Sequence, residues 1–322
     1  MRQFSLRQYE TALDYLNNEA RPLEKLRWGN HIGEVPSDDV LGKLNRYRND
    51  DGGFGKALES DSRARGSTVL ATLEALSILA ELGVPDSNTM LTEALDWLTD
   101  PAGGFDTRRG LWPYLPDDID ASPHAPWWDR NNLEETFSGY LVNPRARVLS
   151  QLYHWPEYGN RCLGRDVLAS QSESVAVIAE NLPDEVSPDT LRSLLSMVSE
   201  SSLPAEIRFR ISEAVRRMIP ASVEIDPLKW NEYCLQPLEV VTSPESPWMP
   251  LLADSVQQHM DYLIRAQETD GSWKPFWNWG GRYPDDWQLA SREWAGVLTY
   301  RNLKAFSVFG RLPSLTDSSV IR

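Results

Sequence analysis

The chain has 322 residues, 41% of them hydrophobic and 25% charged, which is enough to bury the core of one large domain. Its formal net charge of -15 excludes the broad basic surface that nucleic acids and anionic membranes require. The first residues include the charged Arg2, Arg7 and Glu10, so we expect neither a signal peptide nor a membrane span there. With only Cys162 and Cys234 as cysteines, the sequence favours a soluble cytoplasmic protein with free thiols.

A helical hairpin is predicted in the first third of the chain. Apolar residues recur at helical spacing over residues 6–16 and 41–47. The sequence Gly52-Gly53-Phe54 then predicts a tight turn, after which Ser67 is expected to cap a helix that continues to Gly83. Two helices joined by a Gly-Gly-aromatic turn therefore form the first repeating unit.

A second copy of this unit follows. A helix is predicted over residues 91–98, before a second turn at Gly103-Gly104-Phe105. Gly52 and Gly103 lie 51 positions apart, a period typical of stacked helical units. Between Leu133 and Trp155 we expect one further helix, broken at Pro144.

The next part of the chain predicts structure without chemistry. Residues 163–219 read as helices, one of them capped by Ser187. Residues 220–250 contain six prolines and predict a long irregular connection, in which Trp230, Tyr233 and Trp248 are expected to be buried. No run of alternating apolar and polar residues bounded by hairpin turns occurs, so the predicted fold class is all-α.

The clearest motif lies near the C-terminus, where Gln267 ends a predicted helix and Gly271-Ser272-Trp273 follows. A glutamine there can hydrogen-bond the backbone of the turn, the glycine admits a positive φ, and the tryptophan packs over the joint. This pattern resembles the QW repeat of the prenyltransferase and squalene-cyclase superfamily. Residues 41–155 and 255–312 are similar to that repeat. We expect Gln267, Gly271 and Trp273 to hold the scaffold rather than to perform chemistry.

The resemblance implies an α/α toroid, with residues 1–322 forming one domain of about six hairpins around a central cavity. Class II terpene cyclases of this superfamily protonate their substrates with an Asp-x-Asp-Asp motif. That motif is missing here, and Asp117-Asp118-Ile119-Asp120 is its reverse. Related prenyltransferases and lanthionine cyclases use zinc held by cysteine and histidine. Neither cysteine of this chain has a neighbouring histidine, so we expect no metal and no other cofactor.

Three stretches rich in charged and aromatic residues are candidates for a site at the mouth of such a barrel. Residues 58–65 combine carboxylates with arginines, which build either a structural ion-pair network or a polar pocket. Residues 117–129 place acids, a histidine and two tryptophans on a loop stiffened by proline. Residues 277–294 supply aromatic faces that line a pocket or form plain core. The predicted catalytic residues are Glu59, Asp61, Asp120 and His124, and the predicted substrate-binding residues are Arg63, Arg65, Trp127, Trp128, Trp277, Trp279, Tyr283, Trp287, Arg292 and Trp294.

The leading hypothesis is a metal-independent cyclase of a small hydrophobic terpenoid or polyene-derived substrate, acting as a monomer or homo-oligomer. Ring closure would be pericyclic or started by an acid, and it needs one hydrogen-bond donor such as His124, Arg63, Arg65 or Arg292. Two alternatives stay open. The first is a carbohydrate hydrolase or lyase that pairs Glu59 with a second carboxylate, either Asp120 or Asp285. The second is a non-catalytic binding protein.

Overall fold

The computed structural model describes residues 2–115 and 119–313, and this part of the chain is all-α. It contains helices, short 3₁₀ turns and isolated β-bridges, and no β-strand, which confirms the predicted fold class. The chain forms two compact units. Residues 41–223 and 279–287 make up the first, here called the middle unit. Residues 1–40, 224–278 and 288–322 make up the second, here called the terminal unit.

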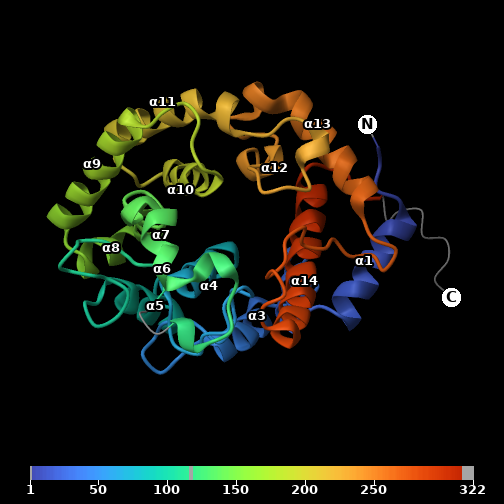
Figure 1. The fold of residues 1–322 in the computed structure, drawn as a ribbon, viewed down its shortest axis with the longest axis horizontal. Coiled ribbons are helices and arrows are strands. Elements are labelled where there is room, and N and C mark those ends of the chain that lie inside the picture. The colour runs from blue at the N-terminus through green and yellow to red at the C-terminus, as the bar shows by residue number, and fades with distance from the viewer. Residues whose placement is uncertain (1, 116–118, 314–322) are drawn as a thin grey trace. The chain divides into compact units, whose positions relative to one another are not determined.

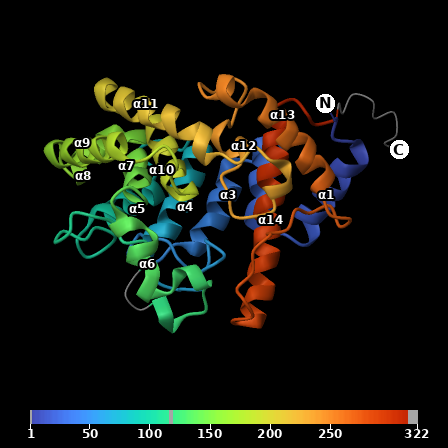
Figure 2. The ribbon, with the colours of Figure 1, turned by 45° about the horizontal axis from the view of Figure 1, so that its top comes forward.

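The middle unit is a stack of helices in which α7 contacts α4, α8, α9 and α10, while α11 contacts α9 and α10 (Figure 1). Figure 2 shows α6 at one end of this unit and α9 and α11 at the other. The helices are α4 (Val69–Glu81), α5 (Thr89–Thr99), α6 (Arg130–Thr136), α7 (Arg145–His154), α8 (Pro156–Cys162), α9 (Arg165–Asn181), α10 (Pro188–Val198) and α11 (Ala205–Ser222). The 3₁₀ turns are η1 (Asn45–Tyr47), η2 (Ile119–Ala121), η3 (Pro126–Trp128) and η4 (Ser138–Tyr140).

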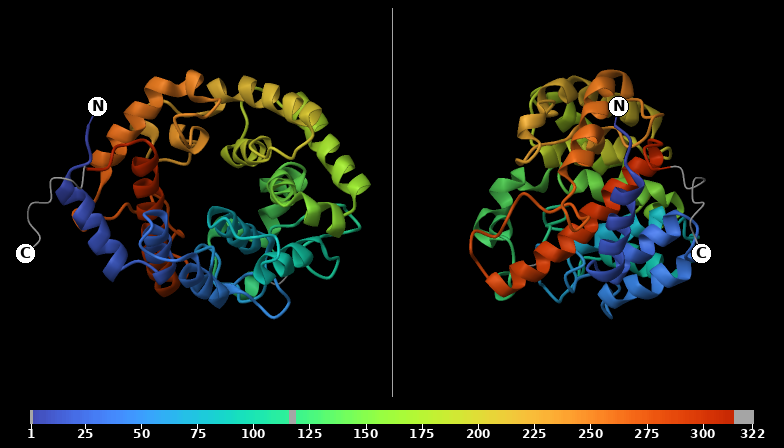
Figure 3. Two further views of the ribbon diagram at one scale, coloured as in Figure 1. Left: turned by 180° about the vertical axis from the view of Figure 1, so that it is seen from behind. Right: turned by 90° about the vertical axis from the view of Figure 1, so that its right-hand side faces the viewer.

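The terminal unit brings the two ends of the chain together. The hydroxyl of Tyr15 lies 3.5 Å from the carbonyl oxygen of Arg292, so α1 runs beside α14 (Figure 3). The elements of this unit are α1 (Leu6–Asn18), α2 (Pro22–His31), η5 (Pro227–Lys229), α12 (Pro237–Val240) and α13 (Met249–Ala266). Two further helices, α3 (Ser37–Leu44) and α14 (Pro284–Val308), have residues in both units.

The turn after α13 has the structure that the motif predicts. The side-chain amide of Gln267 donates to the carbonyl of Gly271 at 3.0 Å and to that of Gln8 at 2.9 Å. Gly271 has a φ of 88°, and a Cβ there would lie 2.1 Å from the carbonyl oxygen of Thr11. The Trp273 indole is buried. This joint therefore fastens the end of α13 to α1 and needs a glycine at its centre.

The predicted repetition of the joint is visible in its hydrogen bonds. The backbone N–H of Phe54 donates to the hydroxyl of Thr72 on α4, and that of Trp273 donates in the same way to Thr299 on α14. The indole N–H of Trp273 donates to the carbonyl of Leu263 at 2.8 Å. At the intermediate turn that role belongs to Trp112, whose indole donates to the carbonyl of Leu98 at 2.8 Å, and not to Phe105.

Several details differ from the sequence-based expectations. Thr68, and not Ser67, caps α4 by accepting the N–H of Ala71, while Ser67 donates to Asp51. Two helices, α6 and α7, occupy the region predicted as one helix broken at a proline. In the proline-rich connection Trp230 and Trp248 are buried as expected, whereas Tyr233 is 64% exposed. No helix in the described part of the chain is long and apolar enough to cross a membrane.

Candidate functional site

Two of the three candidate stretches meet in the middle unit. Ser62 and His124 form an antiparallel bridge, so residues 61–63 run alongside residues 123–125. The N–H of Arg63 donates to the carbonyl of Pro123, and that of Ala125 donates to the carbonyl of Asp61, both at 2.9 Å. The prolines that flank His124 leave its loop few conformations, and this pairing fixes the one it adopts.

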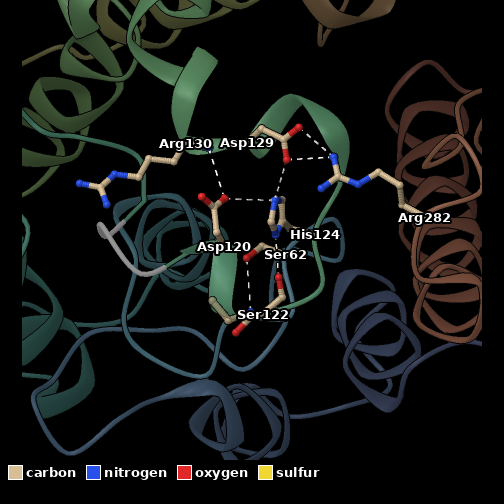
Figure 4. Close-up of polar contacts among 8 residues, drawn as sticks. Ser62, Asp120, Ser122, His124, Asp129, Arg130 and Arg282 are labelled. Carbon is tan, nitrogen blue, oxygen red and sulfur yellow. Dashed lines mark hydrogen bonds and ion pairs between the residues drawn. The ribbon is translucent and has the colours of Figure 1, made fainter.

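His124 is the centre of the site and is only 1% exposed. Its Nδ1 lies 2.6 Å from the carbonyl oxygen of Ser122. A carbonyl oxygen can only accept, so Nδ1 carries a hydrogen. The other ring nitrogen, Nε2, lies 3.0 Å from Oδ1 of Asp129 and 3.6 Å from Oδ1 of Asp120 (Figure 4). A ring nitrogen with a fixed role thus points between two carboxylates.

Each carboxylate also accepts a hydrogen bond from a second group besides its contact with His124. One nitrogen of the Arg282 guanidinium donates to the two oxygens of Asp129, at 2.9 Å and 2.8 Å. This contact, with a smaller contribution from His124, holds the pKa of Asp129 below its ordinary value, and the same contact raises the pKa of Arg282. The backbone N–H of Arg130 donates to Oδ1 of Asp120 at 3.4 Å. Asp129 is therefore ionised at neutral pH and fixed in place.

These groups line a cavity of about 390 Å³ that opens to solvent, with side chains that are mostly polar. They are Asp120, His124, Asp129, Arg130, Asn131, Arg282 and Tyr283. The ring of Tyr283 lies 6.1 Å from that of His124. Two carboxylates lie beside the imidazole and the Arg282 guanidinium contacts one of them, so the cavity suits the polar part of a ligand (Figure 4).

Asp61 does not line the cavity but stabilises a segment that does. It is 3% exposed, and its carboxylate accepts the indole N–H of the fully buried Trp279 at 2.8 Å. Trp279 lies close to Trp287 and Tyr283, with ring centroids 5.7 Å and 6.5 Å away. The Asp61–Trp279 bond therefore anchors the segment that carries Arg282 and Tyr283.

The remaining predicted residues of the middle unit lie outside the lining of this cavity. Trp128 is buried against Tyr114 and Phe137, and its indole N–H has no hydrogen-bond partner in the described structure. Half-buried positions are occupied by Glu59, Arg63, Trp127 and Trp287, and Arg65 is exposed. Among the aromatic residues predicted to bind substrate, Tyr283 lines the cavity. Pro116, Asp117 and Asp118 lie outside the described residues.

Three predicted substrate-binding residues belong to the terminal unit. Trp277 and Trp294 are half-buried and contact each other edge to face, with ring centroids 5.1 Å apart. Arg292 has an exposed side chain. Trp277 and Trp294 form an aromatic pair within the terminal unit.

The sequence analysis did not select Asp129, Arg130, Asn131 or Arg282 as site residues. Asp129 is the last residue of the candidate stretch 117–129, and the sequence signal for its contact with His124 is its position five residues further along the chain. The expectation that no metal is bound rested on the lack of a histidine near either cysteine, and it stays a prediction. One potential ligand atom from each of Asp120, His124 and Asp129 lies within 4.8 Å of the others.

Comparisons with protein-family models, with curated proteins and with solved structures found no significant match to this chain.

Proposed function

We propose that the protein is an enzyme that cyclises a polyene-derived substrate carrying an oxygen group, with the His124 cavity holding that group. One observation carries the proposal. The buried His124 has its Nδ1 hydrogen committed to the carbonyl of Ser122, so its Nε2 presents any exchangeable proton to the cavity. The proposal includes the closure of the helical hairpins into an α/α toroid, which the repeated joints support.

The chemistry follows from the charges around Nε2. Protonated His124 is an imidazolium that donates to Asp129 at 3.0 Å and is stabilised by Asp120 at 3.6 Å. A carbonyl or epoxide oxygen that enters between these groups receives the Nε2 proton or a strong hydrogen bond from it. The substrate carbon attached to that oxygen becomes electron-poor, and a double bond of the same chain attacks it to form the new C–C bond. The carbocation that results loses a proton from a neighbouring carbon to the now neutral Nε2 of His124, which forms a new double bond and restores the imidazolium. Positioned acid catalysis of this kind contributes on the order of 10² to 10⁴ in rate.

Glycoside hydrolysis fits this cavity less well. Hydrolases place their two carboxyl groups roughly 5 to 9.5 Å apart, so that water or a sugar carbon fits between them. Here Nε2 of His124 lies 3.0 Å from an oxygen of Asp129 and 3.6 Å from an oxygen of Asp120, so the imidazole takes the place between the carboxylates where a glycosidic bond would lie. Such a pair concentrates positive charge on one nitrogen rather than flanking a glycosidic bond.

The test is incubation of the purified protein with linear isoprenoid aldehydes and terminal epoxides of several chain lengths. We expect cyclic isomers, detected by an unchanged mass and by replacement of the aldehyde or epoxide by a hydroxyl group. In His124→Gln the rate should fall by a factor on the order of 10² or more. The matched control is His154→Gln, because His154 lies on α7 with a 40% exposed side chain and pairs with Glu200. Failure to convert any such substrate, together with hydrolysis of glycosides, would replace the cyclase with the hydrolase alternative.

A further inference from the structure

The cluster of Asp120, His124 and Asp129 has a property that the proposed reaction does not use. The Ser122 carbonyl fixes the tautomer of neutral His124 with its hydrogen on Nδ1, so Nε2 carries a lone pair and is a hydrogen-bond acceptor. The two groups nearest to it are carboxylate oxygens, which are acceptors as well. Three electron-rich atoms then face one another around a buried nitrogen. A cation between them removes that conflict.

The spacing of the three atoms fits a transition-metal ion. Ligand bonds from imidazole nitrogen and carboxylate oxygen are about 2.1 Å, which places neighbouring ligand atoms about 3.0 Å apart in an octahedron and about 3.4 Å apart in a tetrahedron. Nε2 lies 3.0 Å from the Asp129 oxygen and 3.6 Å from the Asp120 oxygen. These two separations are close to those of atoms that share one ion, and the two carboxylate oxygens lie within 4.8 Å of each other.

Each of the three residues also has the supporting contact that metal ligands usually have. His124 donates its Nδ1 hydrogen to a backbone carbonyl, which orients the ring and makes Nε2 more basic. Asp129 accepts from Arg282, and Asp120 accepts from the backbone of Arg130. Each carboxylate oxygen has two lone pairs, so these bonds leave a pair on Oδ1 of either aspartate for an ion.

We infer that Asp120, His124 and Asp129 bind one divalent first-row transition cation, of the class that includes Mn²⁺ and Zn²⁺. One imidazole and two carboxylates form a mixed nitrogen and oxygen set, which suits these ions better than Mg²⁺, because Mg²⁺ prefers oxygen ligands alone. The cavity of about 390 Å³ leaves room for further ligands on the ion from water or from a bound molecule. The ion and the Nε2 proton of the proposed reaction bind to the same lone pair, so they exclude each other, and in the loaded protein the ion presents the positive charge to the cavity.

The experiment measures ion binding on the whole protein without any substrate, so it stands apart from the proposed reaction. Mn²⁺ is titrated into the metal-free protein, and the loss of the free-ion electron paramagnetic resonance signal counts the bound ions. We expect one ion per chain, unaffected by excess Mg²⁺. Electron spin echo modulation of the bound Mn²⁺ should show an imidazole nitrogen, which reports on His124 without a substitution at that buried position.

Two variants locate the ion. Asp120→Asn removes a charge from a side chain that is 55% exposed, so folding should survive, and Mn²⁺ affinity should fall at least tenfold. Asp189→Asn is the control, since Asp189 lies on α10 and pairs with Arg192. No binding by the wild-type protein, a bound ion without nitrogen modulation, or equal affinities in the two variants would each overturn the inference.

Discussion

The buried histidine of the terminal unit allows a prediction that can be calculated from its surroundings. His259 is 2% exposed and lies 4.7 Å from the ring of Trp230. Its Nδ1 accepts the N–H of Leu238 at 3.5 Å, so the hydrogen of the neutral ring sits on Nε2, which has no hydrogen-bond partner in the described structure. Burial lowers the pKa of His259 from 6.5 to about 3. A proton on Nδ1 would disrupt the bond from Leu238 and place a charge in the core.

The lowered pKa of His259 makes the folded protein less stable in acid. Because the folded pKa is lower than the unfolded one, the unfolded chain binds the extra proton first, and stability falls as pH drops below about 6.5. The loss grows until the pH reaches the folded pKa of about 3. A shift of this size corresponds to about 5 kcal/mol in total, of which roughly 3 kcal/mol is lost between neutral pH and pH 4.5.

The assay compares urea unfolding of the wild-type protein and of His259→Phe at neutral pH and at pH 4.5, followed by tryptophan fluorescence. His259→Phe loses the acceptor for Leu238 at both pH values, so that cost cancels, and carboxylates titrate equally in both proteins. The variant should lack roughly 3 kcal/mol of the acid-induced loss. His154→Phe controls for loss of a histidine. Identical pH dependence in wild type and His259→Phe would refute the reasoning.

Three further predictions concern the joint and the site. Gly271→Ala should destabilise the protein by about 3 kcal/mol or more, because φ is 88° and the new methyl group meets the Thr11 carbonyl. Gly280→Ala, with a φ of 63° and open space around it, should cost only about 1 to 2 kcal/mol, and equal urea midpoints would contradict us. Trp279→Phe should lower the free energy of unfolding by about 1.5 to 3 kcal/mol in the same measurement, because Asp61 loses a buried hydrogen-bond donor. Trp287 is half-buried, and Trp287→Phe should lower the free energy of unfolding by less. Carboxyl NMR should place the Asp129 pKa below about 3.9 in the wild type and closer to that value in Arg282→Gln. The stabilisation that this ion pair gives the fold is therefore present at neutral pH and disappears as acid protonates Asp129. An unchanged Asp129 titration in the variant would assign the pKa shift to another cause.

The local parts of the fold could be predicted because their causes are local. Helical spacing of apolar residues gave α1, α4 and α5 close to their observed bounds, and the Gly271 joint formed as its residue types require. The N-cap of α4 was misplaced by one residue, since Ser67 and Thr68 are both good caps and only backbone geometry chooses between them. Tyr233 was expected inside because aromatic residues are usually buried, yet its side chain is 64% exposed.

The candidate site could be predicted only in pieces. His124 and Asp120 stood out by composition, but the sequence gives no sign that residues 61–63 pair with residues 123–125 through isolated bridges. The contact between Arg282 and Asp129 joins positions 153 residues apart. No local sequence pattern links positions so far apart, so this pairing follows only from three-dimensional packing.

The anchoring of the site by residues 279–287 also bears on the order in which the molecule assembles. The bond between Asp61 and Trp279 closes a loop of 218 residues, and the Arg282–Asp129 contact closes one of 153. Loops of this length close late, because their entropy is lost before the contact stabilises them. During synthesis, α4 to α11 emerge from the ribosome with His124 already in the chain, but Arg282, which fixes Asp129, follows 153 residues after Asp129. A nascent chain therefore carries the helices of the middle unit before it carries a finished cavity.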